Sequence, residues 1–107
     1  MAKWFYVVET NCKDVAREDE FNDWYDNIHL PDILETPGFI RATRYEIDEP
    51  VEGKGRFLAA YEIDSDDIKK TMKTLEENLT KKREQGRITD VTERVSRYIY
   101  KQISSRP

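Results

Sequence analysis

One stretch limits the folds open to this chain more than any other: EFNDWYDNIHLPDILETPGF, residues 20–39. On a helical wheel one sector of this stretch is apolar, and it is formed by Phe21, Trp24, Tyr25 and Ile28. His29, the single histidine of the chain, falls at the edge of that sector. The pattern predicts a helix that packs one face on a core, with a titratable imidazole at the rim of the buried region.

Pro31 interrupts this predicted helix. It has no amide proton to donate to the carbonyl of Asn27, and its ring clashes with that carbonyl in a regular α-helix. We therefore expect the helix over residues 20–34 to be broken between His29 and Asp32, with a short second helical turn opened by Pro31. A break frees backbone groups and redirects side chains, and breaks of this kind often lie beside functional sites.

The rest of the chain alternates between strand-like and helix-like patterns. Aromatic and β-branched residues with a two-residue period predict strands over residues 4–9, 39–47, 56–63 and 95–103. A polar capping stretch at residues 64–67 begins a second helix. This helix carries apolar residues at helical spacing, ends in a run of cations and stops near Gly86.

The predicted order is therefore βαββαβ, the α+β ferredoxin-like arrangement of two helices on one face of an antiparallel sheet. Two helices cover only one face, yet aromatic side chains occupy both faces of the predicted strands, and an exposed aromatic face favours association. A homodimer packed sheet to sheet about a two-fold axis is the simplest remedy. Its interface is predicted on the face with Trp4 and Tyr6 or on the face with Phe5 and Val7, and the pattern leaves both open.

Composition narrows the class of protein. The 107 residues suffice for one domain, residues 1–107, of which 104–107 are expected to form a loose tail. The net charge is −4, and acidic and basic residues are interspersed along the chain. This argues against a nucleic-acid binder, which would show a basic stripe. There is no apolar run that predicts a membrane span and no signal-peptide pattern. The single cysteine, Cys12, fits a reducing compartment, so we expect a cytoplasmic protein in which Cys12 is an inert loop thiol.

The segment WYDNIHLPDILETPGFIRATRY, residues 24–45, resembles the dimeric α+β barrel superfamily, in particular its EthD-like small proteins. The first helix of these proteins typically ends in a W-Y-x-x-x-H-L-P-D pattern, and a P-G-F turn then leads into the second strand. The resemblance implies that the sheets of two subunits form a shared barrel. It also implies a pocket role for His29.

Three residues are candidates for catalysis: His29, Tyr25 and Asp32. The imidazole titrates near pH 6.5 when unperturbed, so partial burial can set His29 as a general acid or base. Tyr25 precedes it by one helical turn, and Asp32 follows it across the expected break. In the alternative interpretation, His29 only caps the carbonyl groups freed by Pro31.

Five further residues are candidates for substrate binding: Trp24, Tyr6, Arg41, Tyr45 and Tyr61. The aromatic rings would form walls of a pocket between the first helix and the sheet, with hydroxyl or indole donors, although the pattern favours a core position for each of them. Arg41 and Arg44 point to opposite faces of one strand, so at most one can point inward. An inward arginine would suit a carboxylate or phenolate ligand. A single histidine with no matching ligand set predicts no metal site.

Together these residues favour an enzyme that needs no cofactor and acts on an aromatic or polyketide-like small molecule. Proton transfer at His29 would drive isomerisation, cyclisation, dehydration or decarboxylation, which makes the protein an isomerase or a lyase. A dimeric binding module that holds a hydrophobic metabolite without turnover is the first alternative. A haem-dependent monooxygenase is the second, because some proteins that share this fold degrade haem and use an axial histidine, as His29 could be.

Overall fold

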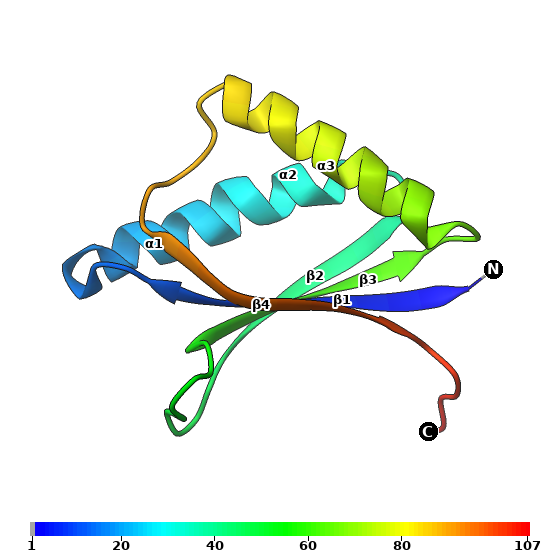
Figure 1. Cartoon of the computed structure of the whole chain (residues 1–107), viewed down its shortest axis with the longest axis horizontal. Helices are drawn as coiled ribbons and strands as arrows, with labels where there is room; N and C mark the ends of the chain where they lie inside the picture. The colour runs from blue at the N-terminus through cyan, green and yellow to red at the C-terminus, as the bar shows by residue number, and fades with distance from the viewer. Residues whose placement is uncertain (1) are drawn as a thin grey trace.

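The computed structural model describes residues 2–107 and has the predicted α+β ferredoxin-like order of elements (Figure 1). Strand β1 (Lys3–Cys12) leads through a 3-10 turn, η1 (Val15–Arg17), into helix α1 (Glu18–Trp24), a π-helical turn η2 (Tyr25–His29) and helix α2 (Leu30–Leu34). Then follow β2 (Phe39–Glu46), β3 (Phe57–Asp64), α3 (Ile68–Glu84) and β4 (Thr92–Lys101). Within the described residues no helix is both long enough and apolar enough to cross a membrane.

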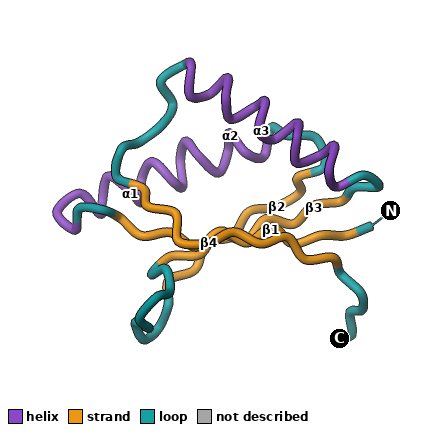
Figure 2. Tube along the Cα trace, viewed as in Figure 1, coloured by secondary structure: helices purple, strands orange, loops and turns teal. Residues whose placement is uncertain are grey.

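The four strands form one antiparallel sheet in the order β2-β3-β1-β4. Both helical segments lie on the same side of this sheet, as the tube view shows (Figure 2). On the other side the sheet carries no helix, and the β2–β3 connection and the C-terminal residues extend away from it. The fold therefore has two layers, with one covered face and one open face of the sheet.

The predicted break at Pro31 is wrong, because α1, η2 and α2 form one continuous helix. The amide of Leu30 donates to the carbonyl of Tyr25, five residues back, and Leu30 keeps helical dihedral angles of −59° and −48°. This π-turn offsets the carbonyl groups by one residue from the positions that the ring of Pro31 would strike in a regular α-helix. The helix accommodates the proline by widening one turn.

The covered face of the sheet holds the core. Alternate residues of β1 and β3 point at the helices and are buried there: Tyr6, Val8, Thr10, Phe57, Ala59, Tyr61 and Ile63. They pack against helix residues of which Phe21 and Leu75 are the most completely buried. The face with Trp4 and Tyr6 is therefore covered by the helices, and the open face is the one with Phe5 and Val7.

The open face carries several exposed aromatic side chains. Four large side chains on it are between 42% and 58% exposed: Phe5, Tyr45, Tyr98 and Tyr100. Backbone pairing places Tyr98 opposite Val7 and Tyr100 opposite Phe5, so these side chains are neighbours. Tyr45 lies on the same face of the sheet at its other edge, on β2. The name open face is used below for the whole side of the sheet that the helices do not cover.

Candidate functional site

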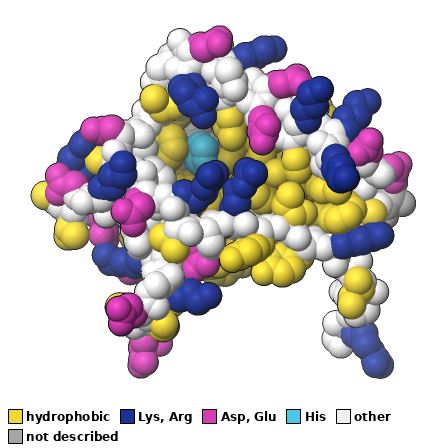
Figure 3. Space-filling model, viewed as in Figure 1, with side chains coloured by type: hydrophobic (Ala, Val, Ile, Leu, Met, Phe, Trp, Pro, Cys, Tyr) yellow, Lys and Arg dark blue, Asp and Glu magenta, His cyan; other side chains and the backbone are white. Residues whose placement is uncertain are grey.

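Two adjoining hollows lie between the helices and the sheet, with volumes of about 260 Å³ and about 340 Å³. Four residues line both of them: Trp24, His29, Leu79 and Thr92. Figure 3 shows that the histidine is visible from one side of the molecule, within an opening that Lys and Arg side chains flank. His29 thus stands where the two hollows meet and where they open to the surface.

The π-turn places the ring of His29. Residues five apart on a regular α-helix point about 140° away from each other, so Trp24 and His29 would not meet there. In a π-turn the hydrogen bonds span five residues, so side chains five apart point in more similar directions than on an α-helix. The ring centroids of Trp24 and His29 lie 4.5 Å apart, with an angle of 17° between the ring planes. The ring of Tyr25 meets His29 edge to face at 5.0 Å. The helix distortion at Pro31 therefore produces an aromatic cluster around the imidazole.

Burial sets the protonation state of His29. The surrounding apolar side chains disfavour the imidazolium and lower the pKa of His29 from 6.5 to about 4, although the carboxylate of Asp32 acts in the opposite direction. The imidazole is therefore neutral at pH 7 and has one nitrogen free to accept a proton.

Asp32 is almost fully buried, and its carboxylate is held by Arg87. The Arg87 Nε lies 2.8 Å from one carboxylate oxygen and its Nη2 lies 3.0 Å from the other, a bidentate pair. Asn78 of α3 donates to the backbone carbonyl of Asp32 at 2.8 Å. These contacts connect α2 to α3 and to the segment that follows α3. Both carboxylate oxygens of Asp32 are therefore engaged in holding these elements together.

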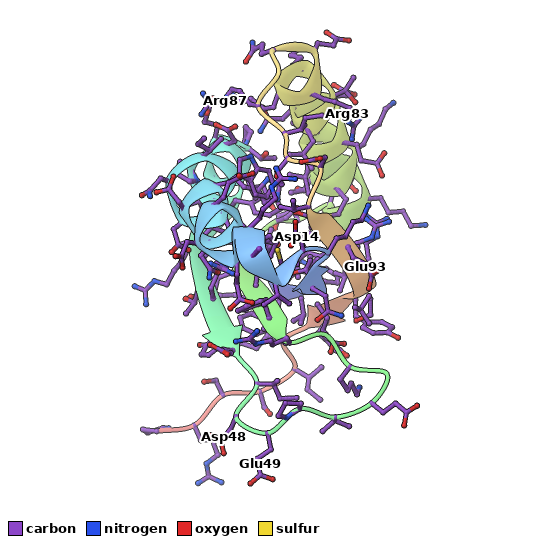
Figure 4. The ribbon with its side chains drawn as sticks, turned by 90° about the vertical axis from the view of Figure 1, so that its left-hand side faces the viewer. Asp14, Asp48, Glu49, Arg83, Arg87 and Glu93 are labelled. Atoms are coloured by element: carbon purple, nitrogen blue, oxygen red, sulfur yellow. The ribbon has the colours of Figure 1, made fainter. Side chains whose placement is uncertain are left out.

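Gly86 brings Arg87 to Asp32. It has a φ of +75°, a left-handed conformation that glycine adopts without a steric cost. The amide of Gly86 donates to the carbonyl of Arg83 at 3.0 Å, and the amide of Arg87 donates to that of Lys82 at 2.9 Å, which is the Schellman ending of a helix. Figure 4 labels Arg83 on the last turn of α3 and Arg87 just after it, away from the Asp48–Glu49 connection. The chain reversal thus places two arginines beside the smaller hollow.

Tyrosines form much of the wall of the larger hollow. Tyr6 and Tyr61 stack with their ring centroids 5.6 Å apart, and Tyr25 completes the wall from the helix. Burial raises the pKa of Tyr25 and raises that of Tyr61 well above the usual value of 10.0, so both phenols stay protonated at neutral pH.

Three polar atoms around the hollows have no hydrogen-bond partner within residues 2–107. They are the indole nitrogen of Trp24 and the hydroxyl oxygens of Tyr61 and Thr92. All three residues line the hollows. Buried polar atoms are nearly always hydrogen-bonded. The phenols of Tyr61 and Tyr25 lie close enough to interact with each other, whereas the indole nitrogen of Trp24 and the hydroxyl of Thr92 have no such neighbour within residues 2–107.

The structure brings six of the eight predicted site residues to the hollows: His29, Tyr25, Asp32, Trp24, Tyr6 and Tyr61. The predicted placement of the other two, Arg41 and Tyr45, is wrong. The side chain of Arg41 is 72% exposed and lies 3.7 Å from Glu62, and Tyr45 is 56% exposed on the open face. A β-bulge is the cause: Phe39 pairs with Ile63, but Arg41 pairs with Glu62, so the extra residue between them reverses the faces of β2.

Arg44 is the inward arginine of β2, and only one of Arg41 and Arg44 points inward. Its side chain is 13% exposed, and its guanidinium carbon lies 4.4 Å from the centroid of the Tyr25 ring. It donates to Asn22 at 2.8 Å and to Asp26 at 3.0 Å. Arg44 supports the helix behind Tyr25 and does not line either hollow.

Sequence reasoning missed the cations around the hollows. Lys82, Arg83, Arg87 and Arg94 all line them. The run of cations at the end of α3 was explained by the helix dipole alone. The structure shows that Lys82 and Arg83 of this run also line a hollow. Groups of three or more side chains suited to a metal ion are absent from the described part of the chain.

Comparison with solved structures shows the fold. HapK from Hahella chejuensis superposes with a TM-score of 0.66 at 15% identity, over 97% of this chain and 96% of that one. A dimeric ferredoxin-like protein from an uncultured marine organism gives a TM-score of 0.67 at 15% identity, over 100% and 99%. An ethyl tert-butyl ether D (EthD) family protein from Bacillus halodurans gives 0.60 at 14% identity, over 96% and 100%.

The resemblance to EthD-like proteins is confirmed at the level of the fold by these structures. A comparison with curated protein sequences gives no match. A family model described as a domain of unknown function, DUF4286, matches residues 3–99. The chain therefore belongs to the DUF4286 family.

Proposed function

We propose that this protein is a small-molecule enzyme in which His29 moves a proton on a planar aromatic or polyketide-like substrate without a cofactor. The observation that supports this proposal is the position of a neutral imidazole at the junction of two hollows with aromatic walls. A titratable group held beside an apolar cavity is the usual starting point of a general acid–base site.

The chemistry follows from the groups around the hollows. The neutral nitrogen of His29 would take a proton from an acidic carbon or hydroxyl of the substrate and return it to another atom, which gives isomerisation, cyclisation or dehydration. Negative charge that develops on a carbonyl oxygen needs hydrogen-bond donors close by. The indole N–H of Trp24 is a buried donor without a partner in residues 2–107, and it suits this role.

We assign Asp32 and Tyr25 to positioning in this proposal. Asp32 raises the pKa of His29 against the effect of burial, so its charge would stabilise the imidazolium that forms during the reaction. The edge-to-face contact of Tyr25 with His29 holds the orientation of the ring. Neither side chain has to exchange a proton.

A second candidate function is a binding module that holds the same class of molecule without turnover. The observation that favours it is that Arg87 occupies the Asp32 carboxylate, so the larger hollow has no acidic partner for His29. A binder and an enzyme would share the pocket and differ only in proton transfer.

We also propose that the protein is a homodimer, with the open faces of two sheets packed against each other. The support is the aromatic surface formed by Phe5, Tyr45, Tyr98 and Tyr100, which is unusual on a monomer. The likeness to a structure described as a dimeric ferredoxin-like protein agrees with it.

The test of the enzyme proposal needs no knowledge of the natural substrate. The ketone 2-tetralone is bicyclic and exchanges its α-carbon hydrogens slowly, so NMR in deuterated water measures proton abstraction by the protein. We expect the wild type to accelerate exchange and His29→Gln to lose about a hundredfold or more of that acceleration. Arg41→Gln, on the opposite face, is the control and should exchange like wild type.

Each other result identifies a different function. Binding of 2-tetralone without faster exchange would favour the binding module. Full activity in His29→Gln would contradict the role of His29 in proton transfer. A Soret absorption band in the purified protein would instead point to a haem-dependent oxygenase.

A further inference from the structure

Positive charge collects around the two hollows. Their lining residues include four cations, Lys82, Arg83, Arg87 and Arg94, and a single carboxylate, Asp32. The whole chain, in contrast, carries a net charge of −4. The local charge around the hollows therefore has the opposite sign to that of the protein.

Two of the four cations have partners within the protein. Arg87 is paired with Asp32 in the bidentate contact described above. Lys82 lies 2.9 Å from a carboxylate oxygen of Glu35 and 4.0 Å from Asp32. No ion pair between described residues involves the other two, Arg83 and Arg94.

A third arginine, Arg97, belongs with these two. It lies on the same side of β4 as Arg94, since Arg94 pairs with Thr10 and Arg97 pairs with Val8, both of which face the helices. Its guanidinium lies 3.4 Å from the hydroxyl of Tyr6, a residue that lines the larger hollow. Within residues 2–107 it also lacks a carboxylate partner.

These three arginines differ from those on the other helices and strands. Arginines on the helices and strands away from the hollows, and beside β3, each form an ion pair: Arg17 with Glu20 and Asp90, Arg41 with Glu62, Arg44 with Asp26, and Arg56 with Glu18 and Glu46. Apart from Arg106 in the exposed C-terminal residues, the described guanidinium groups without such partners therefore lie at or beside the hollows. Figure 3 shows Lys and Arg side chains next to the histidine on this side of the molecule.

We propose that the ligand of the hollows carries an anionic group, a carboxylate or a phosphate ester, which Arg83, Arg94 and Arg97 hold at the mouth. Its planar apolar body would extend inward along the rings of Trp24 and His29. This inference rests on the proposed function, because it concerns a ligand of the same hollows. It adds the charge and the orientation of that ligand.

Physical chemistry supports the match. A guanidinium presents donors in a planar fork that fits the two oxygens of a carboxylate or phosphate, and such charge-assisted bonds are stronger than neutral ones. The arginine side chains are solvated before binding, so they incur no burial cost until the anion arrives. A cluster of one sign at the mouth of a cleft also raises the rate at which anions enter it. A neutral ligand of the same shape would gain none of these effects.

The experiment compares three probes of one shape: 2-naphthoate, 2-naphthyl phosphate and the neutral 2-naphthamide. Binding is followed by quenching of tryptophan fluorescence and by the NMR signals of the single histidine. In the wild type we expect at least one anionic probe to bind about tenfold or more tightly than the amide. The anion that shows the larger preference identifies the head group.

Three variants test the residues: Arg83→Gln, Arg94→Gln and Arg97→Gln. Each should weaken the anionic probes severalfold and leave the affinity for 2-naphthamide unchanged. Arg41→Gln removes the same charge from the open face of the sheet. It should change neither the affinity for the anionic probes nor that for 2-naphthamide. Thermal melts of the four variants verify that each one is folded.

The contrary outcomes separate the two proposals. If 2-naphthamide shifts the histidine signals and binds as tightly as the anions, the head-group inference fails while the pocket stands. If Arg41→Gln weakens the anions as much as Arg94→Gln does, net charge and not the arginine cluster sets the affinity, and the inference also fails. If no probe at millimolar concentration affects His29, both the inference and the proposed site are overturned. Exchange of 2-tetralone is an independent measurement of the proton-transfer proposal.

Discussion

The six tyrosines of the chain divide equally between the two faces of the sheet. Three lie between the helices and the sheet, are at most 5% exposed and line the larger hollow: Tyr6, Tyr25 and Tyr61. Three lie on the open face and are more than half exposed: Tyr45, Tyr98 and Tyr100. Tyrosine side chains therefore line an enclosed, partly polar cavity on one side of the sheet and form part of an exposed surface on the other side.

This difference separates the two activities proposed for the molecule. On the covered face, buried hydroxyl and indole groups and a neutral imidazole surround a space for a small ligand. On the open face, Tyr98 and Tyr100 lie next to each other on β4 with Phe5 opposite Tyr100, and they form an exposed aromatic surface that suits a second sheet. A substitution on one face should therefore change ligand chemistry or monomer stability, and one on the other face should change association.

Consecutive residues of β1 give the largest contrast between the faces. Tyr6 is 5% exposed and Phe5 is 42% exposed. We expect Tyr6→Ala to lower the free energy of unfolding by about 3–5 kcal/mol, the range for truncating a buried aromatic side chain. Phe5→Ala should cost about 1 kcal/mol or less in the monomer, because its ring already contacts water. Urea titrations at a protein concentration low enough to dissociate a dimer measure both, and equal losses would contradict the two-face description.

The pH dependence of stability reports the burial of His29. Burial lowers its pKa from 6.5 to about 4. As the pH falls below 6.5, the unfolded chain binds a proton at this site and the folded protein does not, so the folded state loses stability until about pH 4. The loss should approach about 3 kcal/mol, given 1.36 kcal/mol per pKa unit.

The difference between wild type and His29→Gln isolates this effect from the titration of carboxylates. The variant lacks the titrating ring, so the gap in the free energy of unfolding should change between pH 6.5 and pH 4 and stay constant above pH 7. Parallel curves over the whole range would show that the imidazole is not shielded from water in the folded protein.

The fold was predictable because its signals are repeated along the chain. Alternating apolar residues identified all four strands, although each real strand begins or ends one to three residues away from the prediction. The cap of α3 was equally legible: the side chain of Asp67 accepts from the amide of Lys70 at 3.1 Å. Periodic patterns survive local irregularities because many residues contribute to each one.

The site was less predictable because single residues control it. One inserted residue at the bulge before Arg41 reversed the faces of β2, and no local sequence signal marks it. The sequence indicates that Pro31 disturbs the helix, but the helix accommodates Pro31 by a π-turn and does not break. The pairing of Arg87 with Asp32 joins residues 55 positions apart, which no pattern within one element can show.

The open face can be disrupted without touching the hollows. Tyr98 lies opposite Val7 on that face and is 58% exposed. In a two-fold sheet-to-sheet dimer Tyr98→Asp would place two carboxylates in an apolar interface, and we expect the dissociation constant to rise by about a hundredfold or more. Sedimentation equilibrium measures the constant.

A matched control is Val15→Asp, which adds the same charge at a residue that is 77% exposed in the η1 turn. It should leave association unchanged. A wild-type protein that sediments as a monomer at micromolar concentration would contradict the dimer proposal itself.

The smallest expected contrast lies within β2, where two arginines point to opposite faces. Arg44 is 13% exposed, stacks on Tyr25 and donates to Asn22 and Asp26, whereas Arg41 is 72% exposed and meets only Glu62 at 3.7 Å. Arg44→Gln should cost about 1–2 kcal/mol, because it removes the hydrogen bonds to Asn22 and Asp26 and the cation–π contact with Tyr25, all made by a guanidinium that is itself largely shielded from water. Arg41→Gln should cost less than about 0.5 kcal/mol, since an exposed ion pair contributes little. Denaturant unfolding of the two variants in parallel measures the difference, and its disappearance in 1 M salt would show that both arginines act through screened charge alone. We expect the difference to persist, because the contact of Arg44 with the buried ring of Tyr25 and its hydrogen bond to the neutral side chain of Asn22 are screened little by salt.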